Sequence, residues 1–514
     1  MLRRSAGILI PLFSLRTRHD LGRGDIGGLG PMLDWALAMG HRLIQLLPLN
    51  ETTPGEASPY SPLSIFAIDP LYIAVEQIEG IPDAALKQAY AEIGGRRKVA
   101  REVVRSKKLD LLGQAFRWFL TAGGGEERAA FSKFQKANEY WLPAYALFRA
   151  LKDRFNWKPW DEWPYALRNL DRCAIGQARA ELADSIARYS YWQFLAHRQI
   201  CAARANYHAA GAMIGGDLAF SPGRDSAEVW SRQDHFDFSR LVGAPPDAFS
   251  ANGQRWGLPM PRWDRMGAEG WPLVRSRMRQ ARDLYDVVRI DHVVGLYRTY
   301  NFAADSDDLG NFTPAEVTAQ RQQGESIMRA IQAEAPDTDL IAEDLGLIPD
   351  WVHDSLQNLK VPGYKVLRWE KAGRGNPEDR YVDPACYSEL SVASTGTHDT
   401  ETLAQWWREC GAQQRRLLVE SVGIETREVW DRDSLDELTL DALLEALYAA
   451  PSVVVIEPLQ DLFGWTARIN YPGTVRASNW SWRLPAAIEH LKSSPVIARR
   501  AATLAGIAKR TGRF

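Results

Sequence analysis

The sequence predicts an α/β protein with a (β/α)8 or TIM barrel fold, and three observations support this fold class. Eight short apolar runs recur along the 514 residues, and continuous apolar strands are typical of parallel sheets covered on both faces. Helical stretches separate most of these runs. Several runs end in an acidic residue, as expected where the carboxyl ends of barrel strands form a site. An open, doubly wound sheet is the alternative.

The predicted strands follow one another along the chain with one long interruption. They are GILIPLF (7–13), RLIQLLPL (42–49), GAMIGGDLAF (211–220), YDVVRIDHV (285–293), TDLIAEDLG (338–346), YKVLRW (364–369), SVASTGTHD (391–399) and SVVVIEPLQD (452–461). The interval between the second and third strands is far longer than an ordinary βα connection.

That interval carries a helical pattern, because Leu182, Ile186, Tyr189 and Trp192 recur at helical spacing. We therefore predict a mainly helical insertion over 74–205, with a separate domain as the alternative. Smaller loop insertions are expected at the carboxyl-terminal face of the barrel. Residues 1–514 are otherwise predicted to form a single barrel without a separate C-terminal β-domain.

The composition excludes several classes of protein. The 62 basic and 64 acidic residues give a formal charge of −2, whereas a nucleic-acid binder needs a basic excess or a basic face. No apolar window approaches the length of a membrane span. The four cysteines lie far apart without zinc-ligand spacing, so a cytoplasmic protein is expected. The 19 tryptophans suit either a large core or a ligand with flat apolar faces.

Three acidic residues at the ends of predicted strands form the strongest chemical pattern. Asp291 follows Arg289 by two residues, and the guanidinium would favour the ionised form that a nucleophile requires. Glu343 follows an apolar run, where a carboxyl keeps its proton to higher pH. Two carboxyl groups in such opposite environments are typical of glycosidic bond chemistry. Asp399, beside His398, could bind ring hydroxyls in the transition state.

Two alternatives to this interpretation follow from the residues alone. Any one of the three carboxylates could be a strand-end cap or an ion-pair partner, although three at strand ends favour a site. The pattern also leaves open whether Glu343 or Asp344 faces the site, because adjacent side chains on a strand point to opposite sides. Elsewhere, GRGDIG (22–27) is interpreted as a turn, since the acidic residue that a dinucleotide site needs is missing.

Several motifs in order make the chain resemble a known family. They are SPYSPLSIFAIDPLYI (58–73), KDRFNWKPWDEWP (152–164), GAPPDAFSANGQRWGLP (243–259), RIDH (289–292), AEDLG (342–346), STGTHDT (394–400) and RINYPGTVRASNWSWRL (468–484). Nearly the whole chain is similar to the amylomaltases, or 4-α-glucanotransferases, of glycoside hydrolase family 77 in the α-amylase clan.

The resemblance implies a retaining double displacement through a covalent glycosyl-enzyme, with transfer of an α-1,4-glucan segment to the 4-hydroxyl of another glucan or glucose. It implies Asp291 as nucleophile, Glu343 as acid/base and Asp399 as transition-state stabiliser, with no metal or organic cofactor. Further positions match substrate-binding residues of the family. They are Tyr60, Asp217, Asp247, Gln254, Trp256, Arg289, His398 and Asn470.

The chain departs from the family pattern near the site. Leu258 stands where the family usually has Asn, and Val293-Val294-Gly295-Leu296 replaces a common Phe-Arg-Gly-Phe. Two alternatives therefore remain open: an α-1,4-glucan hydrolase with little transfer, and a non-catalytic glycan-binding barrel. The three intact carboxylates argue against the second. The substrates are expected to be α-1,4-glucans and maltooligosaccharides, without a nucleic-acid or membrane partner, and the oligomeric state is not predicted.

Overall fold

Eight parallel strands form one sheet in the computed structural model, which describes residues 2–99, 101–246, 253–305, 309–373, 379–424 and 427–514. Their order is β10–β11–β12–β1–β2–β3–β6–β9. The bounds are β1 (Ser5–Leu9), β2 (Leu43–Gln45), β3 (Met213–Leu218), β6 (Val287–Ile290), β9 (Asp339–Ala342), β10 (Gly363–Val366), β11 (Ser391–Ser394) and β12 (Val454–Pro458). Each of these strands overlaps one of the eight predicted runs.

The two end strands of this sheet, β9 and β10, meet and complete a barrel. The backbone N–H of Ala342 donates to the Pro362 carbonyl at 2.9 Å, and the N–H of Tyr364 donates to the Asp344 carboxylate at 2.7 Å. Gly363 permits this approach, because a Cβ there would overlap the Asp344 carboxylate. The predicted TIM barrel is therefore confirmed, and the open-sheet alternative is wrong.

Strand register brings the acidic strand ends to one level of the barrel. Asp217 pairs with Arg289 across β3 and β6, and Ile290 pairs with Ala342 across β6 and β9. The residues that follow these two strands, Asp291 and Glu343, therefore leave the sheet side by side at its carboxyl-terminal edge.

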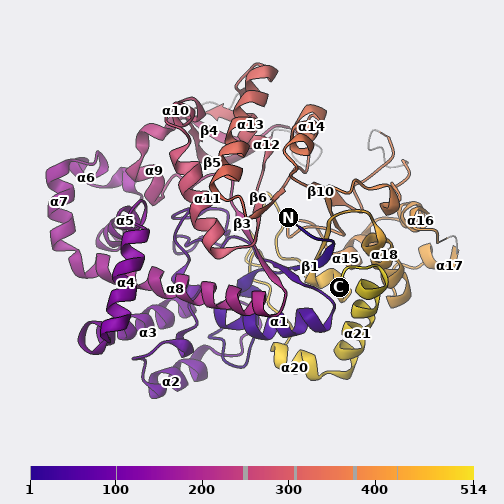
Figure 1. Cartoon of the computed structure of the whole chain (residues 1–514), viewed down its shortest axis with the longest axis horizontal. Helices are drawn as coiled ribbons and strands as arrows, with labels where there is room; N and C mark the ends of the chain where they lie inside the picture. The colour runs from indigo at the N-terminus through magenta and orange to yellow at the C-terminus, as the bar shows by residue number, and fades with distance from the viewer. Residues whose placement is uncertain (1, 100, 247–252, 306–308, 374–378, 425–426) are drawn as a thin grey trace.

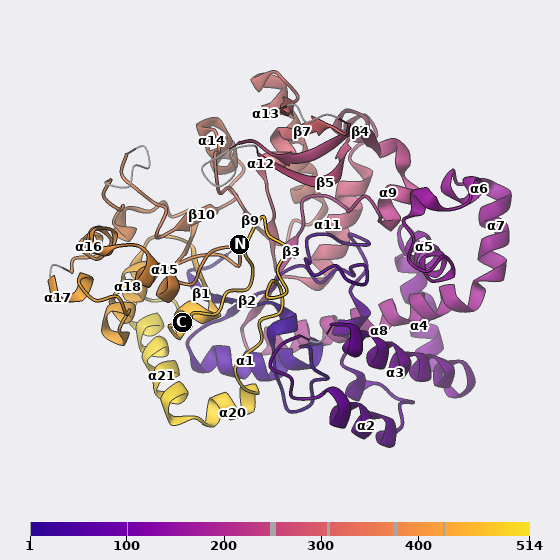
Figure 2. The same ribbon diagram turned by 180° about the vertical axis from the view of Figure 1, so that it is seen from behind.

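Helices surround the sheet (Figures 1 and 2). Those outside the long insertion are α1 (Leu29–Ala38), α11 (Pro272–Leu284), α13 (Val317–Glu334), α14 (Asp350–Asn358), α15 (Leu403–Glu409), α16 (Ala412–Ser421), α18 (Glu437–Ala449), α20 (Ile488–Ser493) and α21 (Pro495–Arg510). Five further short helices are α9 (Ala227–Ser231), α10 (Trp263–Ala268), α12 (Val294–Tyr297), α17 (Arg427–Trp430) and α19 (Leu459–Leu462). None of the helices in the described ranges has the length and apolarity to span a bilayer.

The segment between β2 and β3 is mainly helical. Its helices are α2 (Asp83–Ile93), α3 (Arg101–Ala122), α4 (Gly125–Ala137), α5 (Leu142–Arg154), α6 (Tyr165–Arg168), α7 (Arg172–Glu181) and α8 (Ala183–Ala209). They gather at one side of the barrel (Figure 1). The last helix, α8, packs against α1, α11 and β3, so it returns the chain to the barrel wall.

A second, antiparallel sheet lies beside the barrel, and the sequence analysis did not predict it. Its order is β5–β4–β7–β8, with bounds β4 (Phe236–Ala244), β5 (Gln254–Pro261), β7 (Thr299–Ala303) and β8 (Asn311–Thr313). Two of the expected loop insertions, after β3 and after β6, thus pair with each other. This sheet places β5, which carries Gln254 and Trp256, beside the site.

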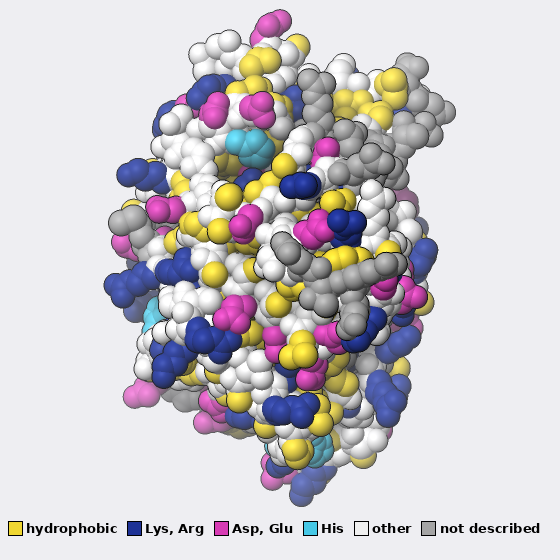
Figure 3. Space-filling model, turned by 90° about the vertical axis from the view of Figure 1, so that its right-hand side faces the viewer, with side chains coloured by type: hydrophobic (Ala, Val, Ile, Leu, Met, Phe, Trp, Pro, Cys, Tyr) yellow, Lys and Arg dark blue, Asp and Glu magenta, His cyan; other side chains and the backbone are white. Residues whose placement is uncertain are grey.

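The surface carries both signs of charge close together. On the face shown in Figure 3, Lys and Arg side chains are interspersed with Asp and Glu. This distribution agrees with the formal charge of −2 for the whole chain.

Candidate active site

A cleft of about 370 Å³ lies at the carboxyl-terminal end of the barrel. It gathers residues from the segment after β2, from β5, from the ends of β6 and β9, and from the loops after β11 and β12. Eight of the predicted site residues line it: Tyr60, Gln254, Trp256, Asp291, Glu343, His398, Asp399 and Asn470. Asp247 lies outside the described residues.

Arg289 lies beneath the cleft and joins two carboxylates. Its Nη1 donates to both oxygens of Asp217, at 2.8 and 2.9 Å, and to Oδ1 of Asp291 at 2.9 Å. Burial alone would lower the pKa of Arg289, but Asp217, Tyr60 and Asp291 raise that pKa well above its usual value. The guanidinium therefore stays charged and fixes one oxygen of Asp291.

Asp217 does not line the cleft, although the sequence analysis placed it among sugar-binding positions. The residue is 2% exposed, and besides Arg289 it accepts a hydrogen bond of 2.6 Å from the Tyr60 hydroxyl. Its oxygens are thus occupied by protein donors. Asp217 supports Arg289 and Tyr60 from below, and Arg289 likewise lies under the cleft.

Glu343 is held by backbone N–H groups on the cleft wall. One oxygen accepts from His292 N at 2.7 Å and the other from Leu345 N at 3.0 Å. His292 has a φ of 47°, a left-handed conformation that is unusual for a residue other than glycine and collects at functional sites. Burial raises the pKa of Glu343 to about 7, and the negative charge of Asp291 adds to that rise.

The choice between Glu343 and its neighbour is settled by the geometry. Asp344 points away from the cleft, where it accepts from Tyr364 N and lies 3.1 Å from Nδ1 of His353. Of these two neighbours, only Glu343 lines the cleft, where Asp291 also lies. His353 is therefore a partner of Asp344 on the side away from the cleft.

Asp399 reaches the cleft from the loop after β11. Asn470 Nδ2 donates to its Oδ1 at 2.6 Å, and His398 Nε2 lies 3.3 Å from its Oδ2. Burial opposes ionisation, but His398 and Asn470 outweigh it and lower the pKa of Asp399 to about 2. In turn, Asp399 outweighs the effect of burial on His398 and raises the pKa of that imidazole.

Aromatic rings form much of the remaining wall. Tyr60 stacks on His398 with centroids 5.1 Å apart and planes 12° apart. Trp256 and His292 make a T-shaped contact with ring centroids 4.8 Å apart, and the Trp256 indole N–H donates to Gln254 at 3.3 Å. These contacts fix the orientation of both predicted aromatic residues.

Trp480 and His292 also line the cleft, and the sequence analysis did not select them. Trp480 lies 5.9 Å from Tyr60 and 5.7 Å from His398, measured between ring centroids. A signal was present, since Trp480 follows the predicted Asn470 within one loop and His292 completes the RIDH motif. Within the described ranges, no cluster of three or more His, Cys, Asp or Glu side chains could hold a metal ion.

Comparisons with known proteins identify the family of the chain. The family model described as 4-alpha-glucanotransferase matches residues 10–489. A 4-alpha-glucanotransferase of Thermus thermophilus is 32% identical over 462 residues, with 87% of this chain and 88% of the relative covered. One of Chlamydia trachomatis is 31% identical over 502 residues, with 95% and 92% covered.

A solved structure extends the likeness to three dimensions. The amylomaltase of Streptococcus agalactiae, in complex with acarbose, superposes with a TM-score of 0.86 at 27% identity, with 99% of this chain and 100% of that chain covered. The motif order, the cleft and these matches lead to one conclusion: this chain belongs to the 4-α-glucanotransferase family.

Proposed function

We propose that this protein moves a segment of an α-1,4-glucan to the 4-hydroxyl of another glucan or of glucose, with retention at the anomeric carbon. One observation carries the proposal: Asp291 and Glu343 line the same cleft in opposite surroundings. Asp291 is ion-paired with Arg289, whereas burial raises the pKa of Glu343 to about 7. An ion-paired carboxylate facing a protonated carboxyl is what a retaining reaction on a glycosidic bond requires.

In the first step Asp291 attacks the anomeric carbon while Glu343 protonates the departing glycosidic oxygen. Arg289 holds Oδ1 of Asp291, and within the described residues Oδ2 accepts no hydrogen bond, so Oδ2 is the attacking oxygen. Asp399, ionised because its pKa is about 2, binds sugar hydroxyls more strongly as positive charge develops on the ring. The product is a covalent glycosyl-enzyme.

In the second step Glu343, now a base, removes the proton from an incoming hydroxyl that attacks the glycosyl-enzyme. A glucan 4-hydroxyl gives transfer, and water gives hydrolysis. The carboxylates are the same in both cases, so acceptor binding against the cleft wall and exclusion of water decide the outcome. Trp256 and Trp480 provide flat apolar surfaces on that wall. The shared name of the relatives favours transfer over the hydrolase alternative.

A product analysis with maltotriose tests the proposal. Purified protein is incubated with maltotriose and the oligosaccharides are resolved by length, with the Asp291→Asn variant as the blank. Glucose together with products longer than maltotriose supports transfer. Maltose and glucose without longer products would instead support hydrolysis, and unchanged maltotriose would support binding alone.

We also propose the substrates, the domain organisation and the location of the protein. The substrates are α-1,4-glucans and maltooligosaccharides, in keeping with the acarbose bound by the Streptococcus agalactiae relative. We propose one catalytic unit in which the helical segment 74–205 is an insertion into the barrel. A cytoplasmic location is proposed because all four cysteines are free thiols, as in proteins of reducing compartments.

A further inference from the structure

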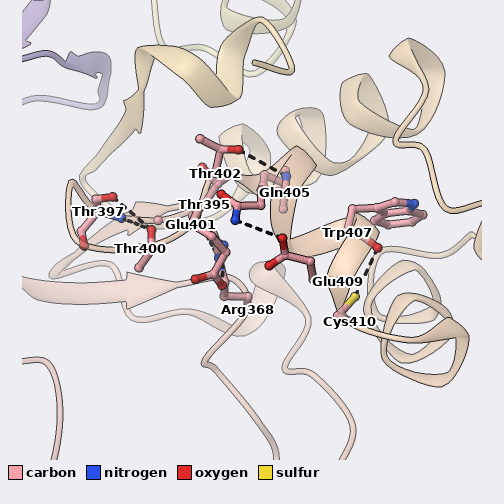
Figure 4. Close-up of polar contacts among 12 residues, drawn as sticks. Arg368, Thr395, Thr397, Thr400, Glu401, Thr402, Gln405, Trp407, Glu409 and Cys410 are labelled. Atoms are coloured by element: carbon pink, nitrogen blue, oxygen red, sulfur yellow. Dashed lines mark hydrogen bonds and ion pairs between the residues drawn. The ribbon is translucent and has the colours of Figure 1, made fainter. Parts of the chain in front are cut away.

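Both ends of the loop that carries Asp399 are hydrogen-bonded to the same buried side chain, that of Arg368. Arg368, in the turn after β10, is 3% exposed. Its Nε donates to the Thr395 carbonyl and its Nη1 to the Glu401 carbonyl, both at 2.8 Å. Figure 4 shows Arg368 beside Thr395 and Glu401. One planar guanidinium therefore links the two ends of the loop Thr395–Glu401, and Thr395 is held in addition by Glu457 and Asp461.

The same loop is tied to its neighbours through Glu401. The Glu401 carboxylate lies 3.2 Å from Arg368 Nη1 and 3.7 Å from Arg468 Nη1. Arg468 in turn donates to the Asp399 carbonyl at 2.8 Å and to the Asn470 carbonyl at 3.1 Å. A continuous chain of polar contacts thus leads from Arg368 to the backbone of Asp399.

The hydrogen bonds inside the loop join residues close in sequence. The position of the loop on the barrel therefore depends on contacts from outside it, such as those of Arg368 and Arg468. The Thr397 N–H donates to the Thr400 hydroxyl at 3.0 Å, and the Asp399 N–H donates to Thr397 Oγ1 at 3.2 Å. These bonds shape the turn, and Figure 4 shows the contacts between Thr397 and Thr400. They do not attach the turn to the barrel, so the direction of the Asp399 side chain depends on the loop ends together with the contacts that Arg468 and Asn470 make with Asp399.

We infer that Arg368 is a positioning residue for Asp399, acting through the two ends of the loop Thr395–Glu401. The inference rests on the proposed function, in which Asp399 stabilises the transition state. Arg368 does not line the cleft, so its effect on the reaction passes through the loop. A displacement of the Asp399 carboxylate weakens contacts that form fully only in the transition state, and kcat falls more than KM changes.

Kinetics of maltotriose disproportionation by Arg368→Met test the inference. The variant keeps the length of the side chain and removes all its donors. We expect kcat to fall by roughly 10- to 100-fold with a change in KM below about threefold. Arg368→Lys retains the charge but bonds only one carbonyl well, and should fall between Arg368→Met and the parent. Glu409→Gln is the matched control, because it removes an exposed charge from α15 that contacts Gln405 instead of the loop.

A double variant separates positioning from simple stabilisation. If Arg368 acts through Asp399, adding Arg368→Met to Asp399→Asn lowers activity by less than about twofold. Additive losses, or an unchanged kcat in Arg368→Met, overturn the inference. Full activity of Asp399→Asn alone would instead overturn the proposed role of Asp399.

A second variant keeps the test usable if Arg368→Met does not fold. A Cβ added at Gly396 would lie 2.5 Å from both Arg368 Nη2 and Thr400 Oγ1. Gly396→Ala therefore crowds the guanidinium and the Thr400 hydroxyl and disturbs the contact between Arg368 and the loop without removing the arginine. The same fall in kcat, again absent in the Asp399→Asn background, is expected, and parental kcat in a folded Gly396→Ala protein overturns the inference.

Discussion

The two halves of the cleft hold their carboxylates by different means. Asp291 and Glu343 directly follow β6 and β9, where strand register sets their places. Arg289, itself on β6, holds the Asp291 carboxylate, and backbone N–H groups hold that of Glu343. Asp399 lies five residues beyond the end of β11, and the side chains of Asn470, from another loop, and of its own neighbour His398 hold it in place. The strand half is therefore fixed by the sheet itself, and the loop half depends on a polar network.

This difference predicts different responses to substitution. In the strand half, a side-chain change leaves the backbone in place and removes one chemical group. In the loop half, changes at residues outside the cleft can move the carboxylate. Four substitutions test this contrast, beginning with the one of largest expected effect.

Asp291→Asn removes the nucleophile and should lower turnover of maltotriose by at least about 10³-fold with the fold intact. The matched control is Asp286→Asn at the opposite end of the same strand, where Asp286 pairs with Arg204 and accepts from Ile214 N. That control should lower the melting temperature and retain turnover, since the amino-terminal end of a barrel strand serves stability. Normal turnover by Asp291→Asn would refute the assignment of the nucleophile.

Glu343→Gln should separate activity from stability. Loss of the acid lowers turnover by roughly 10²- to 10⁴-fold. In the parent, turnover should fall as pH rises through about 7, because burial raises the pKa of Glu343 to that value and the protonated form is the acid. The pH profile of kcat/KM measures this limb.

The same substitution has an opposite effect on folding. Between the unfolded pKa of Glu and about 7, the unfolded chain releases a proton that folded Glu343 keeps, so the stability of the parent falls as pH rises through that window. Glu343→Gln has no such titration and should gain about 1–3 kcal/mol over the parent at pH 8 relative to pH 4. Denaturant unfolding at both pH values measures it, and parallel pH dependence in both proteins would contradict the raised pKa.

Asn470→Ala probes the loop half with a smaller effect. Asn470 donates to Asp399 at 2.6 Å, and loss of a hydrogen bond to a charged group should lower kcat by about 10- to 100-fold. Because Asn470 helps to lower the pKa of Asp399, the acid limb of the kcat profile should move to higher pH in this variant. A fall in kcat without that movement would assign Asn470 to substrate contact alone.

The same contrast explains what could be predicted from the sequence. The eight barrel strands are local apolar runs, and the acidic residues that follow them are visible in the same windows. The antiparallel sheet was missed because β4 pairs with β7 across about 60 residues, and its burial pattern lacks strict alternation. Nothing local marks such a distant pairing.

The contacts within the site could not be predicted from the sequence for the same reason, because they join residues that are distant in the chain. The sequence could not tell Asp344 from Glu343 as the cleft residue. The distinction comes from β10, where the Tyr364 N–H donates to the Asp344 carboxylate. Asp217 matched a sugar-binding position, yet the register of β3 and β6 places it against Arg289 and below the cleft. Trp480 became part of the site through its contacts with Tyr60 and His398, which come from distant parts of the chain.

Leu258→Asn should have the smallest effect and concerns the wall, not the carboxylates. Leu258 lines the cleft on β5 beside Trp256, at the position where the resembling family usually has Asn. An apolar side chain there excludes water from the glycosyl-enzyme, and an amide would both admit water and bind an acceptor hydroxyl. We expect turnover within about threefold of the parent and a change of similar size in the ratio of transfer to hydrolysis. Oligosaccharide products from maltotriose, quantified at equal consumption, measure this ratio. An unchanged ratio of transfer to hydrolysis would mean that Leu258 does not influence the choice between a glucan acceptor and water. That choice would then be assigned to other cleft residues, such as Tyr60 and Trp480.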